Sequence, residues 1–125
     1  MPIGEYTSPD GQLKFIVVCP DGDWIMGFEG FPWHTHGSIL AALSGQDDAT
    51  ATEHCVIDLT SNISVIAMMR TSGKLTDVWI TSDPAADLSS CERYGEAGET
   101  IEFRRWDGTP VKIRPNANLD DVMDN

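Results

Sequence analysis

Apolar runs and apolar–polar alternation along the chain predict a series of β-strands. Residues 13–19 are apolar on both phases of the alternation, which is typical of a central strand. Turn-forming residues follow at 20–23, and residues 24–29 return as a second strand. The first part of the chain therefore predicts an N-terminal hairpin.

Two further hairpins are predicted in the second half. Residues 63–70 and 75–81 are rich in β-branched side chains, and the polar residues between them favour a turn. In the last hairpin, apolar and polar side chains alternate on both sides of Asp107 and Gly108. Three hairpins of this kind indicate mainly antiparallel pairing.

Apolar residues at helical spacing between the first and second hairpins predict two helices. Residues 38–43 place their large apolar side chains on one face, and Gly45 is a typical stop signal. Residues 51–59 also fit a helical face, although their β-branched content leaves a strand as the alternative. Residues 82–99 are polar and predict mainly a connection, with at most one helical turn.

These elements predict an α+β fold, a mostly antiparallel sheet built from three hairpins with one or two helices packed on one face. With 125 residues the chain has the size of one domain, which we place at 1–115. Residues 116–125 are polar and acidic, and we expect them to form a frayed tail.

Charge is the most unusual property of the sequence. The formal net charge is −12, and residues 1–62 contain nine acidic side chains and one basic one, while residues 63–125 contain eleven and seven. Such a surface repels nucleic acid phosphates and anionic lipids, so we expect neither nucleic acid nor membrane as a partner. A basic protein is the expected partner, and the oligomeric state stays open.

The apolar runs are too short to cross a bilayer, and the first residues lack the features of a secretory signal. Three widely spaced cysteines without a CxxC motif favour reduced thiols. We therefore expect a cytoplasmic protein. The sequence contains no glycine-rich phosphate loop and no G-x-S-x-G motif, which argues against nucleotide binding and a serine-hydrolase triad.

Large aromatic rings lie beside carboxylates in the N-terminal half. Asp23, Trp24, Glu29 and Trp33 have the composition of a patch that binds a basic, arginine-bearing partner, and we predict them as binding residues. The alternative is that Trp24, Trp33 and Trp79 are core residues, because they fall in predicted strands or at the entry to a helix.

The pair His34 and His36 is the main candidate for metal chemistry. An HxH step in an extended segment points both imidazoles to one side, as two ligands of a transition metal require. A third ligand would come from Asp47, Glu29, Asp58 or His54. In the alternative interpretation, the two imidazoles bond to backbone in a loop before a helix.

The arrangement His34-Thr35-His36, then ten residues, then Asp47, with Ser44 three positions before the aspartate, resembles the JAMM (MPN+) metalloprotease signature in type and spacing. This resemblance implies a zinc ion held by His34, His36 and Asp47. It further implies that Ser44 helps to stabilise the oxyanion, that an upstream glutamate such as Glu29 is the general base, and that the reaction is peptide or isopeptide hydrolysis.

Two hypotheses for the function follow. The first is a non-enzymatic interaction protein without a cofactor, similar in character, though not in motif, to the small acidic bacterial immunity proteins that neutralise basic toxins. The alternative is a zinc-dependent hydrolase of JAMM type. The charge distribution favours the first.

Overall fold

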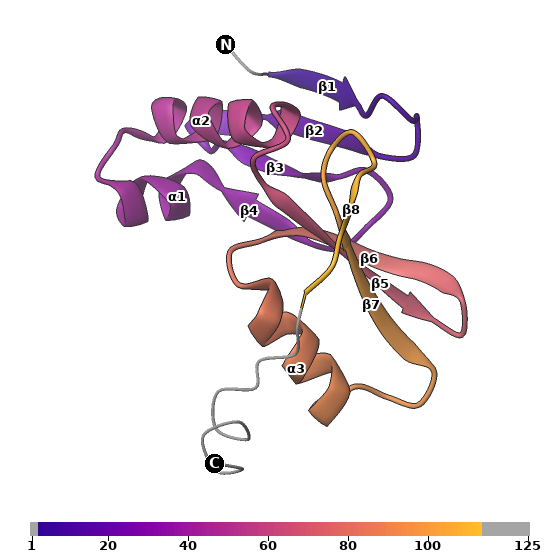
Figure 1. Cartoon of the computed structure of the whole chain (residues 1–125). Coiled ribbons are helices and arrows are strands. Elements are labelled where there is room, and N and C mark those ends of the chain that lie inside the picture. Colours follow the sequence, from indigo (N-terminus) through magenta and orange to yellow (C-terminus); the bar gives the residue numbers. More distant parts are fainter. Residues whose placement is uncertain (1–2, 114–125) are drawn as a thin grey trace.

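The computed structural model describes residues 3–113, which form two antiparallel sheets and three α-helices (Figure 1). Sheet A has the strand order β1-β2-β3-β4, and sheet B has the order β6-β5-β7-β8. The strands of sheet A are β1 (Gly4–Thr7), β2 (Lys14–Val18), β3 (Ile25–Phe28) and β4 (His34–His36). Those of sheet B are β5 (Val65–Thr71), β6 (Lys74–Thr81), β7 (Glu99–Arg104) and β8 (Pro110–Val111). The helices are α1 (Gly37–Ser44), α2 (Asp48–Thr60) and α3 (Pro84–Tyr94).

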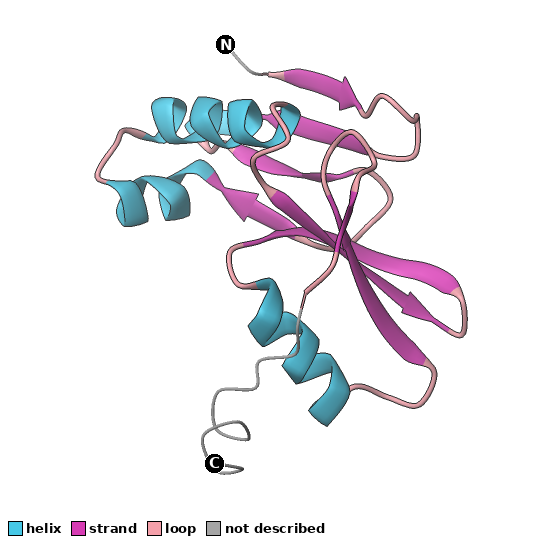
Figure 2. Cartoon of the chain, in the orientation of Figure 1, coloured by secondary structure: helices cyan, strands magenta, loops and turns pink. Residues whose placement is uncertain are grey.

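The predicted α+β class and the antiparallel pairing are confirmed. In the hairpin of β2 and β3, Phe15 pairs with Phe28, and in the hairpin of β5 and β6, Thr71 pairs with Lys74. The strands form two sheets, and the chain passes from the first to the second through α1 and α2 (Figure 2). Neither β1 nor β4 was predicted, since each has few apolar side chains and forms by pairing with a neighbouring strand.

One hydrophobic core extends across both sheets. The inward phase of β2 and β3 meets α2 and one face of sheet B, and the rings of Phe15 and Phe28 pack edge to face with their centroids 5.0 Å apart. Burying a large apolar side chain contributes roughly 1.5–3 kcal/mol to stability, so this shared core holds the two sheets together. Its buried residues are Leu13, Phe15, Val17, Trp24, Met26, Phe28, Val56, Leu59, Ile66, Met68, Val78 and Trp106.

Two polar contacts also join the sheets. The backbone N–H of Trp33, just before β4, donates to Asp77 Oδ1 of β6 at 3.2 Å. Arg104 Nη1 of β7 donates to Asp10 Oδ2 in the loop between β1 and β2 at 2.8 Å. The second contact is an ion pair whose arginine is buried. Both sheets are therefore fixed to each other by specific side chains as well as by the core.

The helices predicted over 38–43 and 51–59 are confirmed as α1 and α2, which pack against each other at one end of the molecule (Figure 1). Gly45 ends α1 in a left-handed conformation, with φ of 76°. At the start of α1, a Cβ atom on Gly37 would lie only 2.5 Å from Thr52 Oγ1 of α2. Glycine at this position therefore permits the close approach of the two helices.

The prediction that residues 82–99 are mainly a connection is wrong, because α3 occupies much of this segment. Asp83 caps the helix by accepting a hydrogen bond from the Ala86 N–H at 3.1 Å, and Pro84 occupies the first turn, where its missing N–H has no cost. Trp79 Nε1 of β6 donates to Asp87 Oδ2 at 3.1 Å and holds α3 against sheet B. Asp83 and Pro84 are also common in loops, so in this polar segment they were not recognised as the start of a helix.

Within residues 3–113, no helix is long and apolar enough to cross a bilayer. The predicted tail at 116–125, and the last residues of the predicted domain at 1–115, lie outside the described residues.

Candidate functional site

The two histidines of the predicted metal site lie side by side on β4. Their rings are in edge contact, with centroids 5.4 Å apart, as the extended HxH step predicts. His34 Nδ1 lies 3.3 Å from the carbonyl oxygen of Pro32, and His36 Nδ1 lies 3.0 Å from Asp23 Oδ1. Because neither oxygen can donate, each Nδ1 is the donor in these two bonds.

The remaining residues of the JAMM resemblance have partners of their own. The Asp47 carboxylate caps α2 by accepting hydrogen bonds from the Thr50 N–H and hydroxyl at 2.8 and 2.9 Å, which lower the pKa of Asp47. The Ser44 hydroxyl accepts from the Gln46 N–H, and Glu29 pairs with Lys14. Among residues 3–113, no three His, Cys, Asp or Glu side chains are grouped as metal ligands. The zinc hypothesis stays a prediction.

The four residues predicted to bind a basic partner occupy different surroundings. Trp24 is only 7% exposed and belongs to the core, as the alternative interpretation states. Trp33 is half-buried and packs beside Phe28, with ring centroids 6.3 Å apart. Asp23 and Glu29 are exposed, but they lie beyond opposite ends of β3. The four side chains therefore do not form one continuous surface patch.

A groove between α1 and α2 combines exposed apolar and acidic side chains. We call it the helix-pair groove; its volume is about 400 Å³. Leu43, which lines it from α1, is 83% exposed, so its apolar side chain is accessible to a partner. Asp58 lines the groove from α2. The Gln46 and His54 side chains also line it and are hydrogen-bonded to each other. The lining residues are Leu40, Leu43, Ser44, Gln46, Ala51, His54, Cys55, Asp58 and Ser64.

Cys55 in this groove is not suited to nucleophilic chemistry. Burial raises the pKa of its thiol to about 11, and the charge of Asp58 acts in the same direction. The reactive form of cysteine is the thiolate, and a raised pKa reduces its population at neutral pH. His54 is bonded to Gln46, so the groove is better suited to binding than to catalysis.

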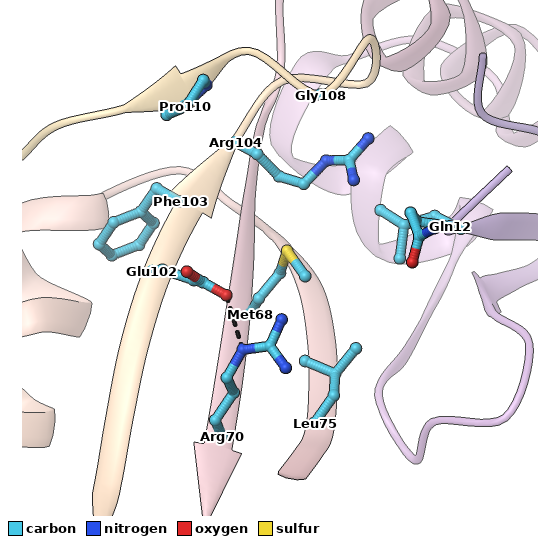
Figure 3. Close-up of a pocket in the computed structure, with 10 residues that line it drawn as sticks. Gln12, Met68, Arg70, Leu75, Glu102, Phe103, Arg104, Gly108 and Pro110 are labelled. Carbon is cyan, nitrogen blue, oxygen red and sulfur yellow. Dashed lines mark hydrogen bonds and ion pairs between the residues drawn. The ribbon is translucent and has the colours of Figure 1, made fainter. Parts of the chain in front are cut away.

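A second cavity, which we call the Arg70 pocket, lies between the loop of β1 and β2 and the core-facing side of sheet B (Figure 3). Its volume is about 460 Å³, within the range of small-molecule sites. Met68 and Leu75 provide apolar walls, and Arg70 and Glu102 bring opposite charges, with Arg70 Nε donating to Glu102 Oε1 at 2.7 Å. This cavity combines apolar surface with a small number of polar groups.

Arg104 forms another wall of the Arg70 pocket, and each of its three side-chain nitrogens already donates a hydrogen bond within the protein. Its Nε donates to the Arg105 carbonyl and its Nη2 to the Trp106 carbonyl, while Nη1 donates to Asp10. The arginine lowers the pKa of Asp10 from 3.8 to about 2, chiefly through that hydrogen bond. Arg104 therefore shapes the pocket, and Arg70 is the cation with unused hydrogen-bonding capacity.

One feature of the sequence indicates this pocket, although the sequence analysis did not identify it. Arg70 continues the inward phase of Ile66 and Met68 along β5, so a charged residue occupies a position expected to be apolar. Glu102, on the adjacent strand β7, carries the opposite charge and pairs with Arg70.

Comparison of the chain with known protein families, with curated proteins and with solved structures gave no match.

Proposed function

We propose that this protein is a non-enzymatic interaction domain that binds a basic protein partner through the helix-pair groove. The observation that carries the proposal is the coincidence of exposed apolar surface with a long segment of the sequence that contains acidic but no basic side chains. No lysine or arginine occurs from Phe15 to Met69. The acidic residues of this segment are Asp21, Asp23, Glu29, Asp47, Asp48, Glu53 and Asp58.

The groove supplies both components of such an interface. Leu43 offers an apolar contact that a partner can desolvate, and Asp58 offers a carboxylate for lysine or arginine. An amphipathic cationic helix fits this chemistry, because its apolar face would lie in the groove and one of its charges would meet this carboxylate. Negative charge of this extent also accelerates association with a basic partner.

The surface therefore differs from the one predicted at Asp23, Trp24, Glu29 and Trp33, while the class of partner is the same. An inhibitor-like role, in which the acidic domain covers a cationic site on its partner, is consistent with this chemistry. The JAMM-type zinc hydrolase is not the function we propose, because the Asp47 carboxylate caps α2 and, within residues 3–113, does not group with His34 and His36.

A defined probe tests the proposal. We would measure the affinity of a helical leucine–lysine peptide of about 15 residues, long enough to form a helix, by fluorescence anisotropy. Leu43→Gln and Asp58→Lys should each weaken binding about tenfold, because one removes the apolar contact and the other reverses a charge in the groove. Raising the salt from about 50 to about 300 mM should weaken binding further.

The matched control is Glu92→Lys, which makes the same change of net charge as Asp58→Lys but lies on α3. It should leave the affinity within about twofold of the wild type, because its charge is remote from the groove. Equal weakening by Glu92→Lys and Asp58→Lys would mean that the peptide responds only to net charge. An unchanged affinity of Leu43→Gln would remove the apolar part of the proposed interface.

A further inference from the structure

The Arg70 pocket has a free hydrogen-bonding edge on a charged side chain. Arg70 uses Nε for Glu102, and within the part of the chain that the structure describes, Nη1 and Nη2 have no acceptor. Figure 3 shows these terminal nitrogens on the side of the guanidinium that faces away from Glu102. A guanidinium with its Nε occupied can still bind a carboxylate end-on through both terminal nitrogens.

The backbone of β5 directs this side chain into the pocket. β5 pairs with β7 without a register shift, so Arg70 keeps the alternation of Ile66 and Met68 and lies on the same face of sheet B. The register shift between β5 and β6 places its extra residue, Thr76, on β6. The ion pair with Glu102 then restrains the long arginine side chain, so part of the conformational entropy of binding a ligand is already lost in the free protein.

The other walls are apolar. Met68 and Leu13 are buried core residues whose edges reach the cavity, and Leu75 lines it from β6. A ligand bound to Arg70 would therefore place a hydrocarbon or aromatic body against these three side chains. A cavity of about 460 Å³ suits a small molecule of this kind.

The local charge balance favours a ligand with one negative charge over a ligand with two. Arg70 and Arg104 are paired with Glu102 and Asp10, so the cationic and anionic groups at the pocket balance. Glu102 beside Arg70 repels further anionic oxygens, and the net charge of −12 disfavours a doubly charged phosphate. The chemistry therefore favours a monoanion with a delocalised, two-oxygen head group.

We propose that the Arg70 pocket binds a small amphipathic monocarboxylate, an aliphatic or aryl-substituted acid, with its carboxylate held end-on by Arg70 and its apolar part against Met68, Leu75 and Leu13. This site lies on sheet B and is independent of the helix-pair groove. A negative result for ligand binding at one site therefore does not contradict the proposal for the other site.

The test uses octanoate and 3-phenylpropanoate as probes, with their neutral amides as controls, and full-length protein labelled at the methionine methyl groups. The methyl NMR signal of Met68, assigned with Met68→Leu, reports whether the ligand enters this cavity. We expect the acids to move the Met68 signal and to bind at least about tenfold more tightly than the amides, because only a carboxylate forms the charge-assisted bonds.

Variants of the two charged residues then separate the roles. Arg70→Gln should weaken acid binding at least about tenfold, and Arg70→Lys should give an intermediate affinity, because lysine keeps the charge without the two-nitrogen edge. Glu102→Gln should strengthen binding, since it removes a neighbouring negative charge. Arg93→Gln on α3 changes the net charge equally and should bind as the wild type does.

Three results would overturn the proposal: amides that bind as tightly as the acids, an Arg70→Gln variant with unchanged affinity, or binding that moves other methionine signals and leaves that of Met68 in place. The Arg70→Lys variant provides a second test if Arg70→Gln reduces stability, and each folded variant is first identified by its methionine spectrum.

Discussion

Arg104 and Asp10 form an ion pair that connects β7 in sheet B to the loop before β2 in sheet A, with Nη1 2.8 Å from Oδ2. The arginine side chain is 10% exposed. Next to the pair, a Cβ atom on Gly108 would lie 3.2 Å from Asp10 Oδ2, and its φ of +97° also favours glycine. The turn between β7 and β8 is therefore shaped around a contact that joins the two sheets.

Loss of the Asp10 charge should destabilise the fold. We expect Asp10→Asn to lower the free energy of unfolding by about 1–3 kcal/mol, because it weakens a charge-assisted hydrogen bond and leaves a buried guanidinium without its counter-charge. Urea unfolding at neutral pH measures the change. Glu53→Gln, an exposed carboxylate on α2 with no ion pair among residues 3–113, should change stability little. Equal effects of the two substitutions would contradict this role.

The same ion pair should make stability depend on acid pH. The pKa of Asp10 is lowered in the folded state from 3.8 to about 2. A carboxylate whose pKa is lowered in the folded state stabilises the fold fully at pH values above its unfolded-state pKa. This stabilisation is lost as the pH falls from about 4 toward about 2. The stability difference between the wild type and Asp10→Asn should therefore shrink over this interval. A difference that stays constant down to the lowest pH at which both fold would show that Asp10 does not titrate in this way.

Close contact between the two helices should make Gly37 intolerant of a side chain. A Cβ atom there would lie 2.5 Å from Thr52 Oγ1, 2.9 Å from Trp24 Cβ and 3.0 Å from the Asp48 carbonyl oxygen. We expect Gly37→Ala to lower the free energy of unfolding by at least about 1–3 kcal/mol, since both backbone and core atoms must shift. The exposed neighbouring substitution Ser38→Ala is the control. Thermal unfolding distinguishes them, and equal melting temperatures would show that the helices can separate without cost.

The Cys55 thiol should react slowly in the folded protein. Its pKa is raised from 9.0 to about 11, chiefly by burial, so the thiolate is roughly 100-fold less populated than for an unperturbed thiol. Iodoacetamide at mildly alkaline pH should therefore modify Cys55 much more slowly in native protein than in urea. Peptide mass spectrometry measures both rates, and native labelling at the denatured rate would mean that the thiol is neither buried nor perturbed.

The sequence predicted the parts of the fold whose periodicity reflects burial. In β2, Phe15 and Val17 alternate with less buried residues, and in α2, Val56 and Leu59 fall on the buried side of the helix. Strands β1 and β4 escaped prediction because backbone pairing, rather than apolar content, stabilises them. Helix α3 was not predicted because its capping residue, Asp83, is also typical of loops.

The candidate sites were less predictable than the fold. The negative charge of the N-terminal half follows from counting residues, because charge adds along a sequence without knowledge of the fold. The helix-pair groove depends on how Leu43 and Asp58, on different helices, come together. The Arg70 pocket brings Gln12 beside Arg70 and Glu102, and this proximity depends on the packing of two sheets that the sequence predicted as one.

The absence of lysine and arginine from Phe15 to Met69 has a practical consequence for chemical and proteolytic mapping. Trypsin has no cleavage site in this segment, so a complete digest releases residues 15–70 as a single peptide. Among the side chains, lysine-directed labels and crosslinkers attach at Lys14, Lys74 and Lys112, none of which lines the helix-pair groove. Such reagents can therefore immobilise or tag the protein while its acidic surface keeps its native chemistry.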